Sequence, residues 1–200
     1  MTVGRIVLAT HNPHKVVEFQ AIVAEVRPDL EVIAYDGPEP IEDGVTFAQN
    51  ALIKARAAAA HTGLPALADD SGICVDVLGG SPGVFSAYWA GHAKNAAANL
   101  ALLLDQLSDI DDTNRTAHFT SAIAVVTPEG DEHVVEGIWP GRLAREAGGA
   151  GGFGYDPAFI PDGQDPENER TVGEWSAEEK NEESHRARAF RELGPLLAEL

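Results

Sequence analysis

Short apolar strands alternate with amphipathic helices over the first third of the chain, and this alternation limits the possible folds more than any other feature. RIVLAT, residues 5–10, predicts a buried strand, and apolar residues from Val16 to Val26 then recur at the spacing of one helix face. LEVIAY, residues 30–35, predicts a second strand. Strand and helix units in this order are typical of α/β proteins.

The pattern continues along the chain and then changes to a hairpin. Residues 46–63 predict a helix with Thr46 as N-cap and Gly63 just past its end. Residues 95–107 predict a further helix, residues 117–139 predict a hairpin with a Pro-Glu-Gly-Asp turn, and a long helix ends the chain. This combination favours an α/β fold with a mixed, twisted sheet and flanking helices.

Asp69, Asp70 and Ser71 stand together between two strand-like runs, LPALADD at residues 64–70 and ICVDVL at residues 73–78. Adjacent carboxylates are costly to bury unless a cation or another partner compensates. One interpretation is a strand that ends in a solvated turn, and the other is a polar site that holds a cation. This stretch alone leaves both interpretations open.

The charge of the chain argues against several classes of partner. It has 14 basic and 32 acidic side chains and a formal net charge of −18, which disfavours nucleic acid and anionic membranes as partners. No apolar run approaches the roughly 20 residues of a membrane span, and the N-terminus lacks the pattern of a secretory signal. We therefore expect a soluble cytoplasmic protein with one domain over residues 1–200.

Two glycine patterns lack the context that would give them a function. Residues 149–154 fit G-x-G-x-x-G, but no clear strand leads into them and YDP follows instead of a helix. Residues 79–83 fit G-x-S-x-G, but a proline directly follows the serine, where a nucleophile elbow passes into a helix. Neither pattern predicts a dinucleotide site or a hydrolase elbow.

Three of the four lysines stand beside other polar residues at predicted turns and helices. THNPHK, residues 10–15, spans a strand-to-helix turn, where backbone N–H groups, the helix dipole and a lysine can face one anion. Asn50 and Lys54 share one helix face, and Glu42 precedes that helix. Each feature also fits a solvated helix face, but with the adjacent aspartates they resemble a site for a polyphosphate and a divalent metal.

Six segments resemble, in this order, the inosine triphosphate pyrophosphatase family: THNPHK, EDGVTFAQNALIKA, ADDSG, GGSPGVFSA, GGFGYDPAF and EEKNEESHR. The resemblance extends from near residue 5 to near residue 190. It implies a homodimer of two-lobed α/β subunits with the site in a central cleft between the lobes. It also implies Mg²⁺-dependent hydrolysis of ITP, dITP or XTP to the monophosphate and pyrophosphate, which keeps deaminated purines out of DNA and RNA.

The resemblance assigns roles residue by residue. Asp70 matches the catalytic proton acceptor and a metal ligand, Glu42 matches a second metal carboxylate, and Asp69 is the third carboxylate available to the metal. The substrate-binding residues are expected to be Thr10, His11, Asn12, Pro13, His14, Lys15, Lys54, Ser71, Phe153, Gly154, Tyr155, Asp156, Lys180, His185 and Arg186.

The choice of base requires donors as well as stacking. A 6-keto purine differs from a 6-amino purine in its need for hydrogen-bond donors, and His185 and Arg186 can supply them. Phe153 or Tyr155 would stack on the ring. Ser184 is expected to cap the last helix and so place both donors at its start.

Two other functions remain open. A pyrophosphatase or phosphatase for other modified nucleotides, such as modified pyrimidines, would share the aspartates and lysines but bind a different base. A non-catalytic nucleotide-binding module would bind a metal-nucleotide complex without turnover. Turnover of a panel of triphosphates would distinguish the first function from hydrolysis of deaminated purine nucleotides. Tight ITP binding without turnover would support the second function.

Overall fold

The computed structural model describes residues 4–199, apart from the side chains of His14 and Glu199. The chain divides into two compact units. Unit 1 consists of Met1–Asp70, Ser121–Gly137 and Ala189–Leu200, and unit 2 consists of Ser71–Thr120 and Ile138–Arg188. The first boundary between the units therefore falls between Asp70 and Ser71, at the adjacent polar residues noted in the sequence.

The strands form a mixed sheet of seven strands with the order β2-β1-β3-β5-β6-β7, and β4 pairs with β3. β1 pairs in parallel with β2 and with β3, whereas the pairs β3–β4 and β6–β7 are antiparallel. The predicted α/β fold with a mixed sheet and flanking helices is confirmed. The strands are β1 (Gly4–Leu8), β2 (Leu30–Ala34), β3 (Ala66–Val75), β4 (Ser81–Pro82), β5 (Thr116–Val126), β6 (Glu132–Leu143) and β7 (Phe159–Pro161).

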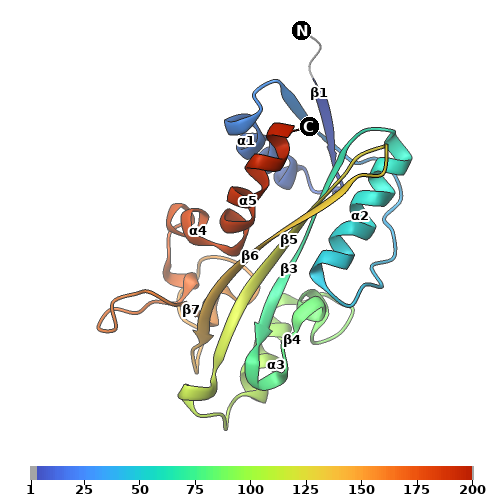
Figure 1. Cartoon of the computed structure of the whole chain (residues 1–200). Helices are drawn as coiled ribbons and strands as arrows, with labels where there is room; N and C mark the ends of the chain where they lie inside the picture. The colour runs from blue at the N-terminus through green and yellow to red at the C-terminus, as the bar shows by residue number, and fades with distance from the viewer. Residues whose placement is uncertain (1–3, 200) are drawn as a thin grey trace. The chain divides into compact units, whose positions relative to one another are not determined.

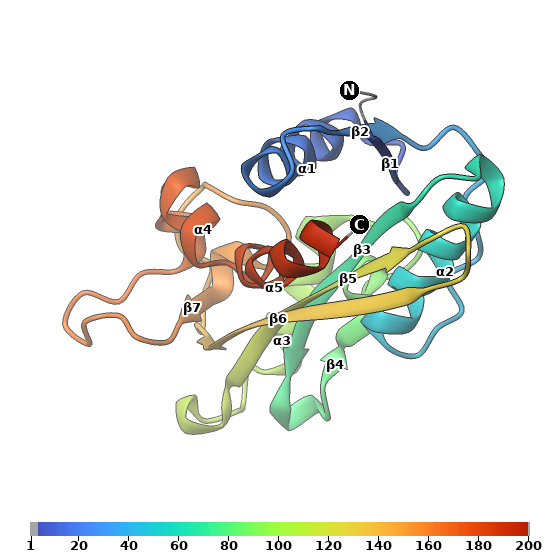
Figure 2. The same ribbon diagram turned by 45° about the horizontal axis from the view of Figure 1, so that its top comes forward.

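The core of unit 1 combines the predicted strand and helix units with the end of the chain. Helix α1 (Pro13–Val26) packs against α5 (His185–Glu199), and the rings of Phe19 and Phe190 meet edge to face at 4.7 Å between centroids. Figures 1 and 2 show α1 and the C-terminal part of α5 side by side. Their apolar faces bury Leu8 of β1 in the same cluster.

Helix α2 (Phe47–Thr62) begins and ends where the sequence predicts. The Thr46 hydroxyl accepts a hydrogen bond from the backbone N–H of Gln49, and Gly63 adopts a left-handed conformation with φ of 67°. Alanines fill the buried face of α2 and allow its backbone to approach its neighbours closely. Asn50 belongs to this buried face, and Lys54 follows it one turn later on the same side, so the packing of the face fixes where both side chains point.

Strand β3 differs from the prediction of two strands around the aspartates. It is continuous over Ala66–Val75, and Asp69 within it is 7% exposed. The solvated turn considered in the sequence analysis is therefore wrong. Its physical premise, that the aspartates have no compensating partner, fails because each one pairs with a lysine from a helix.

Unit 2 has its own core around Ile73, Trp139 and Phe159, covered by α3 (Ala96–Gln106). The acidic segment before the last helix includes the 3₁₀ turn Val172–Glu174 and α4 (Ala177–Glu183). The hydroxyl of Ser184 accepts from the backbone N–H of Ala187, which confirms it as the N-cap of α5.

No helix in the described part of the chain combines the length and the apolar character needed to cross a membrane.

Candidate functional site

Five of the predicted residues come together in unit 1 as a charged cluster, defined as Lys15, Glu42, Lys54, Asp69 and Asp70. Three elements carry four of them. Lys15 lies in the first turn of α1, Lys54 lies on α2, and the aspartates are successive residues of β3, while Glu42 belongs to the segment before α2. Strand geometry separates the two aspartates, since successive side chains point to opposite faces.

Lys15 and Asp69 form the first ion pair of the charged cluster. The Lys15 Nζ donates to both carboxylate oxygens of Asp69, at 2.7 and 2.9 Å. The Asp69 side chain is 5% exposed, so the lysine compensates a carboxylate that is almost fully removed from water. The pair ties β3 to the first turn of α1, where the segment of residues 10–15 ends.

Lys54 joins the other two carboxylates of the cluster. Its Nζ lies 2.9 Å from Glu42 Oε2 and 3.3 Å from Asp70 Oδ1. Burial alone lowers the pKa of Lys54, but its attraction to the carboxylates outweighs burial and raises the pKa above the ordinary value. Lys54 is therefore a firmly protonated cation between two carboxylates.

Asp70 is the carboxyl group of the cluster whose affinity for a proton is increased. Burial is the largest influence and raises the pKa of Asp70, Lys54 opposes this rise, and Glu42 adds to it. A hydrogen bond from Asn50 also favours the charged form. The result is a carboxylate that takes up a proton more readily than an ordinary aspartate, as a general base must.

The turn at residues 10–15 is tied to neighbouring loops. The His11 Nε2 lies 3.0 Å from the carbonyl oxygen of Gly37, and the His11 ring stacks on Tyr35. The backbone N–H of Asn12 donates to the Thr10 hydroxyl at 3.2 Å, and Pro13 is the first residue of α1, as predicted. The side chain of His14 lies outside the described part of the chain. Binding of phosphate by this turn stays a prediction.

The carboxylates of the cluster fit a magnesium ion only in part. Among the described residues, no group of three or more His, Cys, Asp or Glu is arranged to hold a metal ion. Glu42 and Asp70 converge on one cation, the Lys54 ammonium, whereas the Asp69 carboxylate binds Lys15. Two carboxylates suffice for Mg²⁺, which usually completes its shell with substrate phosphates and water.

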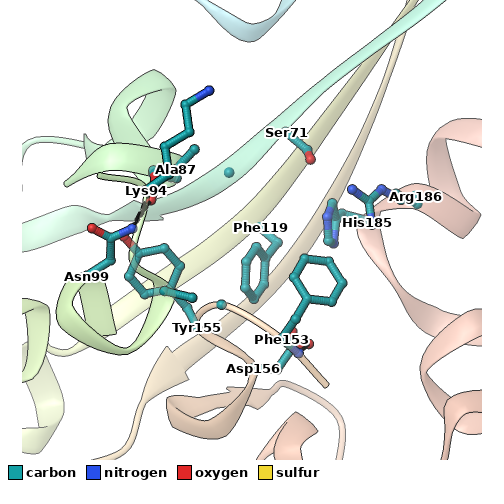
Figure 3. Close-up of a pocket in the computed structure, with 14 residues that line it drawn as sticks. Ser71, Ala87, Lys94, Asn99, Phe119, Phe153, Tyr155, Asp156, His185 and Arg186 are labelled. Carbon is teal, nitrogen blue, oxygen red and sulfur yellow. Dashed lines mark hydrogen bonds between the residues drawn. The ribbon is translucent and has the colours of Figure 1, made fainter. Parts of the chain in front are cut away.

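An aromatic pocket lies in unit 2 and has a volume of about 340 Å³. Figure 3 shows the rings of Phe119, Phe153 and Tyr155 along it, with Ser71 from β3 and with the first residues of α5. Apolar ring faces with a few polar groups suit a flat heterocycle. Of the predicted residues, the pocket gathers Ser71, Phe153, Gly154, Tyr155, Asp156, His185 and Arg186.

Asp156 organises one wall of the aromatic pocket. Its buried carboxylate accepts from the Lys180 Nζ at 2.5 Å and from the backbone N–H of Phe153 at 2.7 Å. The Lys180 Nζ also lies 4.3 Å from the centroid of the Phe153 ring. Asp156 thus holds the predicted residue Lys180 at this wall. Phe153, next to this ammonium group, is 62% exposed.

The two aromatic residues considered for stacking occupy different environments. Tyr155 is buried, and its hydroxyl donates to the carbonyl oxygen of Ser86 at 2.8 Å. Burial raises the pKa of the Tyr155 hydroxyl, which keeps it protonated and able to donate. Phe153 instead presents its ring to solvent, so the geometry favours Phe153 as the stacking residue.

The predicted donors lie at the start of α5. The His185 ring is buried and stacks on Phe119, with 4.9 Å between the centroids and 13° between the planes. The guanidinium carbon of Arg186 lies 5.6 Å from the centroid of the Phe153 ring. Both side chains line the pocket, and Arg186 is the more accessible of the two.

Several residues of the site were missed by the sequence analysis. Ser86, Lys94, Asn99 and Phe119 line the aromatic pocket, yet none had a predicted role. Ser86 belongs to the quoted segment GGSPGVFSA, which was a usable signal, whereas Phe119 has the pattern of an ordinary core residue of a strand. Asn50 was noted on the face of Lys54, but its contact with Asp70 was not foreseen.

Comparisons with known proteins agree over nearly the whole chain. The model of the Ham1 family matches residues 6–196. A dITP/XTP pyrophosphatase of Leifsonia xyli is 62% identical over 196 residues, covering 98% of this chain and 96% of that protein. A dITP/XTP pyrophosphatase of Streptomyces avermitilis is 52% identical over 200 residues, with 98% of each chain covered.

Solved structures give the same result. A HAM1 protein from Coxiella burnetii matches with a TM-score of 0.88 and 39% identity, covering 98% of this chain and 100% of that one. A crystal structure from Mycobacterium abscessus, described as a nucleoside-triphosphatase and dITP/XTP pyrophosphatase, matches with a TM-score of 0.81 and 48% identity, covering 94% and 98%.

Proposed function

The chain belongs to the Ham1 family, and on that premise we propose that it is a pyrophosphohydrolase for the non-standard purine nucleoside triphosphates ITP, dITP and XTP. Water attacks the α-phosphorus, a P–O bond to water forms, and the P–O bond to the departing pyrophosphate breaks. The products are the nucleoside monophosphate and pyrophosphate. The names of the relatives from Leifsonia xyli and Streptomyces avermitilis support this substrate class.

The observation that carries the proposal is the charged cluster of unit 1. Asp70 accepts the proton of the attacking water, for which its raised proton affinity is suited. Lys54, together with Lys15 at the turn of residues 10–15, binds the phosphates and offsets the negative charge that develops on pyrophosphate. A neutral binding pocket would not need two partly buried lysine–aspartate pairs.

Magnesium is part of the proposal. Glu42 and Asp70 are the residues that would hold Mg²⁺, since both already face one cation and offer the oxygen ligands that this metal prefers. The bound ion would supply positive charge to the phosphate oxygens of the substrate. Asp69, the third carboxylate expected at the metal, has the further role of orienting Lys15 in this proposal.

The aromatic pocket of unit 2 selects the base. The Phe153 ring stacks on the purine, and donors from His185 and Arg186 bind the 6-keto oxygen. An adenine would face these donors with an amino group and leave them without an acceptor, which typically costs about 10² or more in selectivity. The proposal also includes a homodimer, as the family resemblance implies, which light scattering of the purified protein tests directly.

The deciding experiment measures pyrophosphate and orthophosphate released from ITP, dITP, XTP, dUTP, ATP and GTP, with and without Mg²⁺. We expect metal-dependent pyrophosphate from the first three and little product from ATP or GTP. Orthophosphate instead of pyrophosphate would mean cleavage at the terminal phosphate. Tight ITP binding without any turnover would contradict the proposal and leave a nucleotide-binding module.

A further inference from the structure

The amide of Asn50 joins two parts of the charged cluster. Asn50 lies on α2 one turn before Lys54, and it is 4% exposed. Its Oδ1 accepts a hydrogen bond from the backbone N–H of Gly44 at 2.9 Å, and its amide opposes the rise in the pKa of Asp70, which indicates that it faces that carboxylate. A carboxylate only accepts hydrogen bonds, so the Asn50 amide nitrogen is the donor to Asp70.

The approach of Gly44 to Asn50 is too close for any other residue type. A Cβ atom on Gly44 would lie 2.5 Å from the Asn50 Oδ1 and 2.8 Å from the Gln49 Cβ. The next backbone N–H, that of Val45, donates to the Gln49 Oε1 at 2.8 Å. Two successive N–H groups therefore anchor the segment that bears Glu42 to the first turn of α2.

We infer that Asn50 is a positioning residue for hydrolysis, which holds Asp70 and the segment bearing Glu42 so that both carboxylates face the same cation. This inference rests on the proposed function. Asn50 acts through the two carboxylates and needs no contact with the substrate. Partners that orient metal-binding carboxylates typically contribute about 10- to 100-fold to activity or to metal affinity.

The test compares two substitutions of Asn50 with a matched control. Asn50→Ala removes both hydrogen bonds, whereas Asn50→Asp retains an acceptor for the Gly44 N–H and removes the donor to Asp70. Gln20→Ala is the control. The Gln20 amide also makes two hydrogen bonds, accepting from Val32 N–H at 2.7 Å and donating to the Leu30 carbonyl at 3.2 Å, and it belongs to the same unit but not to the cluster.

Two readouts separate positioning from stability. The first is kcat and KM for ITP at saturating Mg²⁺, and the second is hydrogen exchange of the Gly44 amide followed by NMR without nucleotide or metal. We expect kcat to fall about 10- to 100-fold in both Asn50 variants with KM little changed. The Gly44 amide should exchange faster in Asn50→Ala only, and Gln20→Ala should keep the wild-type kcat.

The inference is overturned if Asn50→Asp turns over like the wild type, or if Gln20→Ala loses as much kcat as the Asn50 variants. Because Asn50→Asp retains the bond to Gly44, it serves the test even if Asn50→Ala does not fold. An inactive wild type would instead reject the proposed function, and the positioning role with it. An active wild type with unaffected Asn50 variants rejects the inference alone.

Discussion

The charged cluster of unit 1 and the aromatic pocket of unit 2 are built from different kinds of side chain. In the cluster, two lysines form ion pairs with three carboxylates, which leaves one net negative charge. In the pocket, ring faces dominate, and the pair of Lys180 and Asp156 holds the position of the Phe153 ring. Fixed charges suit phosphates and the breaking of a P–O bond, whereas ring faces suit a purine.

Under the proposed function the two units have different roles, with phosphate chemistry in unit 1 and recognition of the base in unit 2. Each unit has its own hydrophobic core, so a substitution in one is expected to leave the packing of the other intact. Substitutions in the charged cluster should therefore lower turnover for every triphosphate by a similar factor. Substitutions in the aromatic pocket should change KM where they remove stacking, and the preference among bases where they remove a hydrogen-bond donor.

The largest effect is expected from Asp70→Asn. An amide cannot take the proton from water, and general-base catalysis typically contributes about 10² to 10⁴ in rate. We expect kcat for ITP to fall by this factor while ITP binding and the melting temperature change little. Pyrophosphate release and equilibrium binding of ITP are the measurements.

Asp69→Asn is the matched control for Asp70→Asn, because it changes the adjacent carboxylate of the same strand. It weakens the hold on Lys15, so KM should rise more than kcat falls. If the two variants lost kcat equally, the assignment of the base to Asp70 would be wrong.

Phe153→Ala should have the next largest effect. Stacking of a base on an aromatic side chain is worth about 1–3 kcal/mol, so kcat/KM for ITP should fall about 10- to 100-fold, mainly through KM. The 62% exposure of Phe153 predicts little loss of stability. Steady-state kinetics with ITP, XTP and ATP should show a similar loss for each base.

Phe85→Ala provides the comparison for Phe153→Ala. Phe85 is also an exposed phenylalanine of unit 2, at 51%, but it does not line the aromatic pocket. Its removal should leave KM unchanged. An equal rise of KM in both variants would contradict a specific stacking role for Phe153.

Arg186→Met should change the choice of base rather than the rate. Methionine retains much of the apolar stem and removes the donors, so the ratio of kcat/KM for ITP to that for ATP should fall about tenfold, as the loss of one charged hydrogen bond implies. A parallel loss for ITP and ATP would show that Arg186 binds phosphate or ribose instead. Competition between ITP and ATP in one assay measures the ratio directly.

The sequence predicts local structure well because its signals are local. The first strand and helix units follow from apolar spacing, and Thr46 and Gly63 mark the ends of α2 by their capping chemistry. The continuity of β3 could not be predicted in this way, because the partner of Asp69 is Lys15, 54 residues away. A contact so distant along the chain leaves no periodic pattern near the aspartates.

The candidate site shows the same limit. The resemblance predicts which residues take part, but which lysine meets which carboxylate depends on the directions of α1 and α2 relative to β3 within unit 1. Phe119 was missed because a pocket wall and a buried core face give the same alternation along a strand. Tyr155 was predicted as an alternative to Phe153 for stacking. The sequence could not show that its hydroxyl binds the carbonyl oxygen of Ser86, because Ser86 lies 69 residues away.

The smallest effect is expected from Tyr155→Phe, which tests whether Tyr155 supports the wall of the aromatic pocket without contacting the base. The substitution removes only the hydroxyl that donates to the Ser86 carbonyl, an oxygen that also lies 3.4 Å from the Asn99 amide nitrogen. Because this second donor remains, the loss should be about 1 kcal/mol of unfolding free energy, or a melting temperature lower by about 2–4 °C. KM for ITP should stay at the wild-type value, in contrast to Phe153→Ala. A rise of KM without a change in melting temperature would place Tyr155 in contact with the base and remove the distinction between these two aromatic residues.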